Sequence, residues 1–360
     1  MGARHRARRQ AGADCGEPSR NRRVHGFPSM FKGIQLAISN YPGSALSQSF
    51  GATEQAFSGA ADVQLAKYEA IYQQALSVGC TPLASAGDWG TANFTKQAGG
   101  NNGSGASPNY YPYPTVIWPA SSPSVTAVGG TWLQYHWRWD PQTTFASYVA
   151  LTNCGCNAVI SEHPIAEAFL AWDATSTQVE AVWRDDLTDI YGVNVTGGGL
   201  SAFFPTPSWQ AGLPSSLTQG ARALPDVSWN AAIDGGVLVY CSVAGGYQPN
   251  VAGWLDVSGT SASTPQIAGL VALVNQMRAS LAKEPIGHLA PKLYELPSSD
   301  FNDIVPQTFG SGANAITLDN NFRYGFGVPG WPCTFGYDLT TGLGSPRAYS
   351  FVYDLATKFP

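Results

Sequence analysis

The stretch Gly259-Thr260-Ser261-Ala262-Ser263-Thr264-Pro265 places a serine in a short Gly/Ser-rich turn. An apolar run over residues 267–274 follows it and predicts a buried helix. A hydroxyl at a helix N-terminus lies at the positive end of the helix dipole, near backbone N–H groups that can stabilise an oxyanion. Two interpretations follow. Either Ser261 or Ser263 caps the helix, with Pro265 in its first turn, or Ser261 is a nucleophile.

Further motifs along the chain favour the nucleophile. They are Ser85-Ala-Gly-Asp88-Trp-Gly90, Trp118-Pro-Ala-Ser-Ser-Pro-Ser-Val-Thr-Ala-Val-Gly-Gly-Thr131, Gly197-Gly-Gly-Leu-Ser201 with Pro207-Ser-Trp-Gln210, Leu224-Pro-Asp-Val-Ser228, and Gly336-Tyr-Asp-Leu-Thr-Thr-Gly-Leu-Gly-Ser-Pro346. With the serine segment, and in this order, they resemble the sedolisin (serine-carboxyl peptidase) family over residues 34–350. The resemblance implies an α/β, subtilisin-like fold with a mainly parallel sheet flanked by helices.

The resemblance also implies roles for individual residues. Ser261 corresponds to the nucleophile, and Asp88 to the aspartate that lines the oxyanion hole. Such an aspartate donates a hydrogen bond only when it is protonated, which requires acid or a raised pKa. The alternative for Asp88 is an ordinary turn aspartate. For the substrate, we expect binding along the edge near Ser39 and at three glycines. These are Gly197, Gly198 and Gly199.

The proton acceptor of the family is missing from the expected place. In the family it is a glutamate four residues before an aspartate on an early helix, so that both carboxylates share one helical face. That helix should precede an edge strand, which we predict at residues 34–40. Before this strand the chain holds only Asp14 and Glu17, in the wrong order and at the wrong spacing. We therefore expect an N-terminally truncated domain that lacks the Glu/Asp pair and cleaves peptides poorly.

The order of the segments supports an α/β fold. We predict a helix over residues 60–76, a buried strand over 81–85, a Gly/Asn/Pro-rich loop over 99–114 and a strand over 124–128. Alternating units of this kind imply a parallel sheet covered by helices. Asp62 and Glu69 fall on the predicted helix, where we expect them to be solvent-exposed surface charges.

Composition separates the first 32 residues from the rest. They hold 8 of the 19 Lys and Arg but only two acidic residues, so the remainder is strongly acidic. We predict a basic, disordered or non-native segment over residues 1–32 and one peptidase domain over 33–360. No apolar h-region follows the basic start, so it is not a secretion signal. The basic segment lacks interleaved aromatics, which argues against nucleic acid, and no apolar run is long enough to span a membrane.

The resemblance further implies one calcium ion near the C-terminus. The candidate ligands are the side chains of Asp303 and Asp338 and the backbone carbonyls of Ile304, Thr334 and Gly336. Oxygen ligands of this kind suit a hard cation. Thr334 stands where the family has glycine, which is tolerable because a carbonyl would ligate. The alternative is that the two aspartates are surface turn residues.

Other hydrolase classes fit less well. A subtilisin-type triad needs a histidine before the serine in its own Gly-containing segment, and neither His136 nor His163 lies in one, while His288 follows the serine. The G-x-S-x-G elbow is absent because Ser263 replaces its second glycine. Six cysteines show no scaffold pattern, so a disulfide from Cys154 or Cys156 and buried free thiols both stay open.

The sequence therefore predicts a monomeric, acid-active serine endopeptidase that acts on peptides or proteins. By resemblance it is extracellular, although no signal peptide is visible. One alternative is a remnant that binds peptides without cleaving them. Another is a secreted carbohydrate-binding or structural protein that uses its 11 Trp and 16 Tyr.

Overall fold

The computed structural model describes twelve parts of the chain. These are residues 24, 26–57, 62–93, 110–134, 137–139, 170–172, 179–184, 194–232, 236–242, 253–309, 316–321 and 327–360. Several residues discussed above lie outside them. They are Asp14, Cys15, Glu17, His136, Cys154, Cys156 and His163. Most of the loop predicted over residues 99–114 lies outside them as well.

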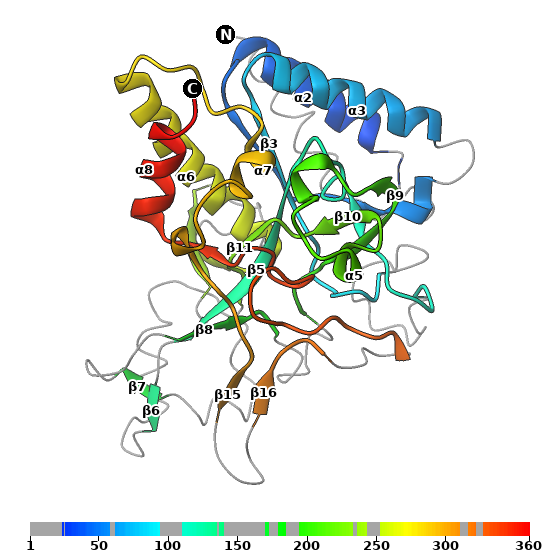
Figure 1. Ribbon diagram of the computed structural model, residues 1–360, viewed down its shortest axis with the longest axis vertical. Helices are drawn as coiled ribbons and strands as arrows, with labels where there is room; N and C mark the ends of the chain where they lie inside the picture. The colour runs from blue at the N-terminus through cyan, green and yellow to red at the C-terminus, as the bar shows by residue number, and fades with distance from the viewer. Residues whose placement is uncertain are drawn as a thin grey trace.

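A five-stranded sheet forms the centre of the molecule (Figure 1). Its strands β1 (Ala45–Gln48), β3 (Thr81–Ser85), β5 (Thr126–Gln134) and β11 (Val227–Asn230) are parallel neighbours in that order. The fifth strand, β8 (Val179–Val182), pairs antiparallel with the far end of β5. The mainly parallel sheet predicted from the sequence is therefore confirmed.

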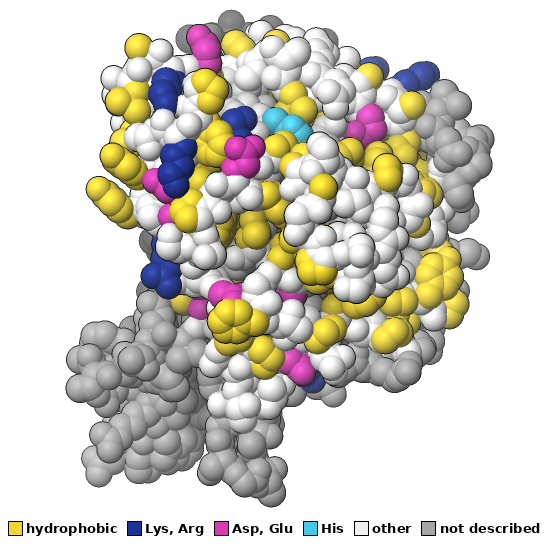
Figure 2. Space-filling view, viewed as in Figure 1, with side chains coloured by type: hydrophobic (Ala, Val, Ile, Leu, Met, Phe, Trp, Pro, Cys, Tyr) yellow, Lys and Arg dark blue, Asp and Glu magenta, His cyan; other side chains and the backbone are white. Residues whose placement is uncertain are grey.

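Helices cover the sheet, as parallel strands require. The long helix α6 (Thr260–Ser280) contacts all four parallel strands, and α8 (Ala348–Thr357) packs against α6. The neighbouring helices α2 (Phe27–Asn40) and α3 (Asp62–Ser77) lie together in another part of the molecule, where α3 contacts β3 (Figure 1). On the face shown in Figure 2, most Lys and Arg side chains lie on the side of α6 and α8.

Short elements complete the described fold. The remaining strand pairs are β2 (Ala52–Thr53) with β4 (Ile117–Trp118), β6 (Trp137–Trp139) with β7 (Leu170–Trp172), β9 (Gly199–Pro205) with β10 (Ala221–Leu224), β12 (Val237–Cys241) with β13 (Gly253–Val257), β14 (Phe301–Asn302) with β17 (Ser345–Pro346), and β15 (Gln307–Phe309) with β16 (Ile316–Leu318). The short helices are η1 (Glu54–Phe57), η5 (Ser208–Gln210), α5 (Ser215–Thr218), α7 (Leu289–Leu293) and η6 (Ser298–Asp300).

The edge strand predicted at residues 34–40 is wrong, because these residues form the second half of α2. Alternating Ile34, Leu36 and Ile38 fit a strand, but the residues before them decide otherwise. Phe27 and Phe31 continue a spacing of three or four residues, and they are buried with Ile34 and Ile38 while Leu36 is exposed. This is the pattern of an amphipathic helix. The domain boundary predicted at residue 33 consequently falls inside α2.

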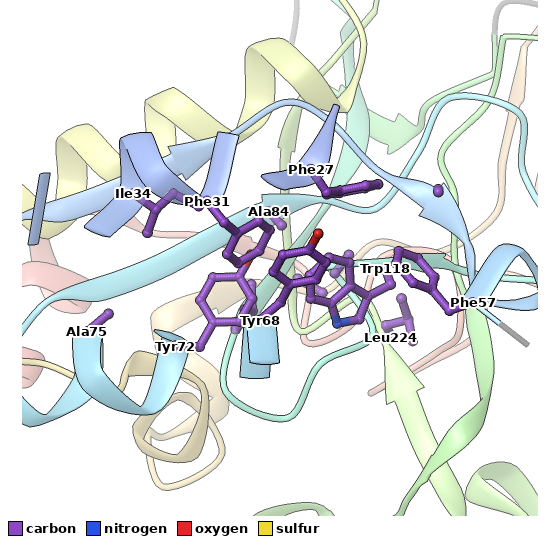
Figure 3. Packing of buried hydrophobic residues seen from close by; sticks show 14 of the residues in the cluster. Phe27, Phe31, Ile34, Phe57, Tyr68, Tyr72, Ala75, Ala84, Trp118 and Leu224 are labelled. Atoms are coloured by element: carbon purple, nitrogen blue, oxygen red, sulfur yellow. The ribbon is translucent and has the colours of Figure 1, made fainter. Parts of the chain in front are cut away.

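An aromatic cluster joins α2 and α3 to the segment that begins at Trp118 (Figure 3). Trp118 is fully buried, and the Phe31 ring stacks on it with centroids 5.4 Å apart. Phe27, Phe57 and Tyr68 also lie within 6 Å of the Trp118 ring centroid. Since large aromatic side chains bury the most apolar area, this cluster anchors the helix pair to the sheet.

Candidate active site

The N-terminus of α6 presents Ser261. The helix begins at Thr260, and its N-cap is Gly259, which has φ +83° and makes no side-chain capping bond. Ser263 is fully buried and its Oγ donates to the carbonyl oxygens of Trp229 and Asn230. Neither serine therefore caps the helix, and of the two only Ser261, which is partly exposed, can meet a substrate.

Asp88 follows β3 and reaches the same helix end. Its Oδ1 accepts hydrogen bonds from the backbone N of Thr260 at 2.8 Å and from the Thr260 hydroxyl at 2.7 Å. A side chain at Gly259 would meet Asp88 Oδ2 at 2.8 Å, so only glycine leaves that oxygen room. Burial raises the pKa of Asp88, although the bonds from Thr260 oppose the shift. The structure thus brings the two predicted catalytic residues to one place.

Ser49 is a site residue that the sequence analysis missed. It follows β1, and its exposed Oγ donates to the carbonyl oxygen of Ser261 at 3.1 Å. Gly87, which follows β3, donates its N–H to the Thr260 hydroxyl at 3.1 Å. The carboxyl ends of parallel strands meet at one edge of a sheet, where α/β proteins bind ligands. That rule would have found Ser49 once β1 had been placed correctly.

An apolar side chain lies between the two segments that follow β1 and β3. A Cβ built on Gly51 would meet Ile117 Cδ1 at 3.0 Å, and one built on Gly87 would meet the same atom at 3.3 Å. Both glycines therefore contact Ile117, and a side chain at either position would press on it.

The predicted substrate residues lie in two places. Ser39 is on α2, exposed, and its Oγ donates to the carbonyl of Gln35, so the edge on which we expected it does not exist. All three glycines of residues 197–199 are buried. Gly197 donates its N–H to the carbonyl of Gly87 at 2.8 Å, and Gly198 packs against the carbonyl of Leu339. Gly197 therefore supports the segment that carries Asp88, and the contact of the glycines with a substrate stays a prediction.

Glu69 is not the solvent-exposed charge that we predicted. Its carboxylate accepts the indole N–H of Trp118 at 2.7 Å and the Ser122 hydroxyl at 2.7 Å, with the Ser124 hydroxyl at 3.4 Å. Burial raises the pKa of Glu69. The helix pattern could not show this, because the partners lie on a segment about fifty residues further along. The side chain of Asp62 lies outside the described residues.

Three buried glutamates bind groups away from Ser261. Besides Glu69, Glu54 accepts the Ser201 hydroxyl at 2.5 Å and the Ala202 N–H at 2.7 Å. Glu180 accepts the hydroxyls of Thr131 and Ser345. Each of these carboxylates is thus committed to its own neighbours, and none is in a position to take the proton of Ser261.

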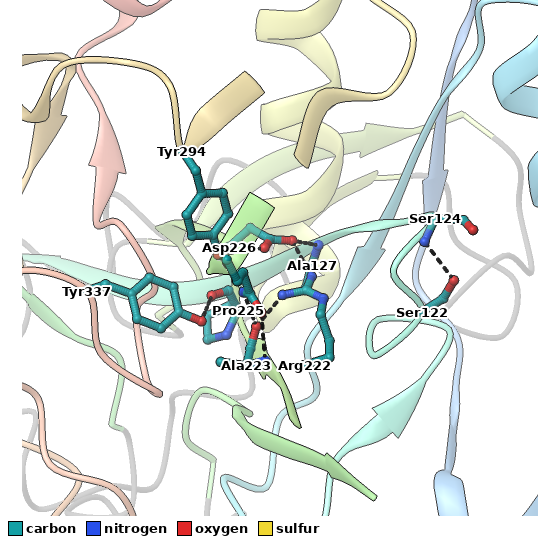
Figure 4. A network of polar contacts seen from close by, with 10 residues as sticks. Ser122, Ser124, Ala127, Arg222, Ala223, Pro225, Asp226, Tyr294 and Tyr337 are labelled. Atoms are coloured by element: carbon teal, nitrogen blue, oxygen red, sulfur yellow. Dashed lines mark hydrogen bonds and ion pairs between the residues drawn. The ribbon is translucent and has the colours of Figure 1, made fainter. Parts of the chain in front are cut away.

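An ion pair lies behind the site, at the start of β11 (Figure 4). Asp226 Oδ2 contacts Arg222 Nη2 at 2.6 Å and accepts the backbone N–H of Ala127 at 2.8 Å. Its Oδ1 accepts the Tyr294 hydroxyl at 2.9 Å. Both charged side chains are fully buried. Since Ala127 belongs to β5, this carboxylate ties β5 to the chain entering β11.

The five candidate calcium ligands lie together. Asp303 Oδ2 accepts the N–H of Gly336 and Asp338 Oδ2 accepts the N–H of Thr334, each at 2.9 Å. The carbonyl of Ile304 accepts the thiol of the neighbouring Cys333. Burial raises the pKa of Asp338, although hydrogen bonds from Thr334, Thr340 and Thr341 to its carboxylate oppose the shift. Oxygen donors of this kind suit a hard cation. Within the described ranges, no group of three or more His, Cys, Asp and Glu is placed to hold a metal ion.

The remaining candidates carry no chemistry here. His288 is partly buried at the N-cap of α7, and among the described residues its Nε2 has no hydrogen-bond partner. Cys80 and Cys333 are free thiols. No helix in the described part of the chain is long and apolar enough to cross a membrane.

Comparison with known proteins agrees with this fold. The sequence matches the Subtilase family (Peptidase S8) over residues 29–312. It is 33% identical over 310 residues to kumamolisin of Bacillus sp. (strain MN-32), an alignment that covers 84% of this chain and 41% of that protein. It is 30% identical over 285 residues to sedolisin of Pseudomonas sp. (strain 101), an alignment that covers 79% of this chain and 36% of that protein.

A solved structure shows the same fold. Pseudomonas sedolisin, a serine-carboxyl proteinase complexed with two molecules of pseudo-iodotyrostatin, superimposes with a TM-score of 0.58 at 26% identity, covering 92% of this chain and 70% of that one. The fold is the subtilisin-like fold of a family of serine-type peptidases. The chain belongs to the sedolisin family within the subtilases. It spans about two fifths of the length of the curated relatives, at 41% and 36%.

Proposed function

We propose that this site hydrolyses internal peptide bonds in acid, with Ser261 as the nucleophile and Asp88 as the hydrogen-bond donor to the oxyanion. One observation carries the proposal. The Asp88 carboxyl bonds to Thr260, the residue directly before Ser261, at the N-terminus of α6. A donor held at the place where negative charge develops is the largest single contribution in acyl transfer.

The position of the acidic proton follows from the geometry. Asp88 Oδ1 accepts both hydrogens of Thr260, so in the acid form the proton belongs on Oδ2. Gly259 has no side chain to cover that oxygen. Oδ2–H can therefore donate to the oxyanion when Ser261 Oγ attacks the carbonyl carbon. Because burial raises the pKa of Asp88, the donor form extends to higher pH than for an exposed aspartate.

The proton of Ser261 needs an acceptor. No glutamate in the 360 residues is followed by aspartate at the fourth position, and the buried glutamates are bound elsewhere. We therefore propose that this chain alone turns over peptides slowly. The loss would be about 10⁴- to 10⁶-fold relative to a complete triad, which is the cost of losing the base.

Supplying the acceptor tests the assignment. A chimera would carry the family's Glu-x-x-x-Asp segment from a close relative in place of residues 1–23, and casein cleavage would be followed from pH 3 to 7. We expect acid-dependent activity that Ser261→Ala abolishes and that Ser263→Ala, with a neighbouring buried hydroxyl, does not. A folded chimera without activity at any pH, or activity that survives Ser261→Ala, would contradict the proposal.

We also propose that calcium binds the native state through Asp303, Ile304, Thr334, Gly336 and Asp338. Support comes from their proximity, since Gly336 donates its N–H to Asp303 and Thr334 donates its N–H to Asp338. Calcium at a hundredfold excess over its Kd would add about 2.7 kcal/mol to the free energy of unfolding. Thermal melts with calcium and with chelator measure this.

The variants Asp303→Asn and Asp354→Asn separate a site from a general salt effect. Asp303 is a proposed ligand, whereas Asp354 lies on α8 beside Lys358. The stabilisation by calcium should fall in the first variant and stay in the second. An equal shift in both would remove the site.

We further propose that the protein acts outside the cell as a monomer on peptide or protein substrates. The membership in a family of peptidases supports the substrate class. Sedimentation of the purified chain tests the monomer.

A further inference from the structure

The hydroxyl of Thr260 lies between two groups of the segment that follows β3. Its Oγ1 accepts the N–H of Gly87 at 3.1 Å and donates to Asp88 Oδ1 at 2.7 Å. A hydroxyl has one hydrogen to donate and two lone pairs to accept with, so Thr260 makes both bonds at once. Its side chain is fully buried, and bulk water therefore does not compete for either bond.

The bond from Gly87 fixes the direction in which Thr260 donates. Because the Gly87 N–H occupies a lone pair of the hydroxyl, the hydroxyl hydrogen is left for the carboxyl of Asp88. The branched Cβ of threonine restricts χ1, which leaves the hydroxyl few other positions. Consecutive hydrogen bonds of this kind also polarise and strengthen one another. The hydroxyl thus holds Asp88 Oδ1 more firmly than the backbone N–H of Thr260 would alone.

The same hydroxyl acts on the charge of Asp88. Burial raises the pKa of Asp88, and the side-chain and backbone hydrogen bonds from Thr260 lower it. The bonds have this sign because a donor stabilises the ionised carboxylate more than the neutral acid. The Thr260 hydroxyl therefore limits how far burial can extend the acid form toward neutral pH.

The described segments packed around Asp88 carry no other titratable side chain. None occurs in residues 260–277 of α6, in residues 194–199, in the rest of residues 86–93, or in residues 45–53, which comprise β1 and the segment after it. The next titratable residue along the chain is Glu54, whose carboxylate accepts the Ser201 hydroxyl at 2.5 Å. Thr260 is therefore the neighbour through which the protonation of Asp88 can be tuned.

We infer that Thr260 is a positioning residue whose hydroxyl keeps Asp88 Oδ1 occupied, leaves Oδ2 as the protonated oxygen, and sets the pH above which the acid form is lost. This role rests on the proposed peptidase function, in which Oδ2–H donates to the oxyanion. Thr260 has no part in the bond-making steps and acts only through Asp88.

Titration of Asp88 tests this role without requiring turnover. The full chain would be labelled with carbon-13 at its aspartate carboxyls, and the Asp88 resonance would be identified as the one that Asp88→Ala removes. Thr260→Val keeps the volume and the backbone N–H but loses the hydroxyl. We expect it to raise the pKa of Asp88 by about one pH unit, the equivalent of one hydrogen bond. Thr260→Ser keeps the hydroxyl and should retain the pKa of the parent.

Thr264→Val is the matched control. Thr264 is also fully buried on α6, but its hydroxyl donates to the backbone carbonyl of Thr260, at 2.7 Å. Each valine variant loses one buried hydroxyl bond, so both should lower the urea midpoint, whereas only Thr260→Val should move the pKa of Asp88. If Thr260→Val does not fold, Thr260→Ala removes the same hydroxyl and is measured in the same way.

Activity of the chimera that carries the Glu-x-x-x-Asp segment links the titration to function. The decline of activity with rising pH should move upward by the same amount in Thr260→Val and stay in place in Thr260→Ser. An unchanged pKa of Asp88 in Thr260→Val, or an equal change in Thr264→Val, would overturn the inference and leave the peptidase proposal standing. A pKa that moves while the decline of activity does not would overturn it too. A folded chimera without activity at any pH would overturn the proposed function, and the inference with it.

Discussion

Two aspartates next to parallel strands of one sheet have opposite surroundings. Among the described residues, the carboxyl of Asp88, after β3, accepts hydrogen bonds from the neutral N–H and hydroxyl of Thr260. Asp226, before β11, meets the guanidinium of Arg222 as well as the Ala127 N–H and the Tyr294 hydroxyl. A neutral environment lets a carboxyl hold a proton, whereas a buried cation favours the ionised form. The difference separates a carboxyl suited to chemistry from one that holds the sheet together.

The largest effect on stability should come from breaking the Arg222–Asp226 pair. Arg222→Met fills a similar volume but leaves the Asp226 carboxylate buried without its cation. We expect a loss of about 3–5 kcal/mol in the free energy of unfolding, the usual cost of an orphaned buried charge. Urea denaturation at pH 7 measures it. A loss below 1 kcal/mol would mean that the neutral donors alone support Asp226, and the contrast with Asp88 would disappear.

The next effect uses Asp88→Ala, which removes the proton-donating oxygen. In the chimera that supplies the missing base, we expect kcat to fall about 10²- to 10³-fold, the cost of one oxyanion donor. Because burial raises the pKa of Asp88, activity of the chimera with Asp88 intact should decline as pH rises through that pKa. The alanine variant should lack this decline.

The matched change Asp226→Ala completes this test. It removes the contact with Arg222, so we expect a lower urea midpoint and a much smaller effect on kcat. If both variants lost stability and kept kcat, Asp88 would be a structural aspartate like Asp226.

The sequence predicted the parallel sheet, and it predicted that Ser261 and Asp88 belong to one site. Both predictions depend on contiguous motifs that lie next to the start of a helix or the end of a strand. It failed where periodicity was ambiguous or partners were distant. The apolar spacing over residues 34–38 suits either the period of a strand or that of a helix. Only the burial of Phe27 and Phe31 shows that the segment is a helix. Glu69 was misjudged because its hydroxyl and indole donors come from residues 118–124. Helical periodicity carries no information about such tertiary partners.

The protonated form of Asp88 requires acid, but acid should also destabilise the fold because of His288. Burial, with the nearby charge of Lys292, lowers the pKa of His288 from 6.5 to about 4. The unfolded state therefore takes up a proton first, and stability is lost as pH falls from 6.5 to 4, by up to about 3 kcal/mol. His288→Gln should remove this loss. The free energy of unfolding of the variant, compared with that of the wild type, should therefore be higher at pH 4 than at pH 7. Urea midpoints at both pH values give the difference.

Three glutamates change the stability of the fold with pH in the direction opposite to His288. Burial raises the pKa values of Glu54, Glu69 and Glu180. A raised pKa makes stability fall as pH rises through the folded value. Since His288→Gln leaves these groups in place, their effect cancels between variant and parent. An identical pH profile for both proteins would show that His288 does not titrate with a lowered pKa.

The smallest effect on stability is expected from breaking an exposed ion pair that resembles the buried Arg222–Asp226 pair. Lys358 and Asp354 form an ion pair at the end of α8 with the same i,i+4 spacing and an N–O distance of 2.5 Å, but the lysine side chain is 46% exposed. Water screens this pair and already solvates each partner, so Lys358→Met should cost less than about 1 kcal/mol, and less again in 0.5 M salt. The same measurement on Arg222→Met should show no comparable salt effect, because buried charges are poorly screened. Equal losses for the two variants would show that spacing and distance, and not burial, set the strength of these pairs.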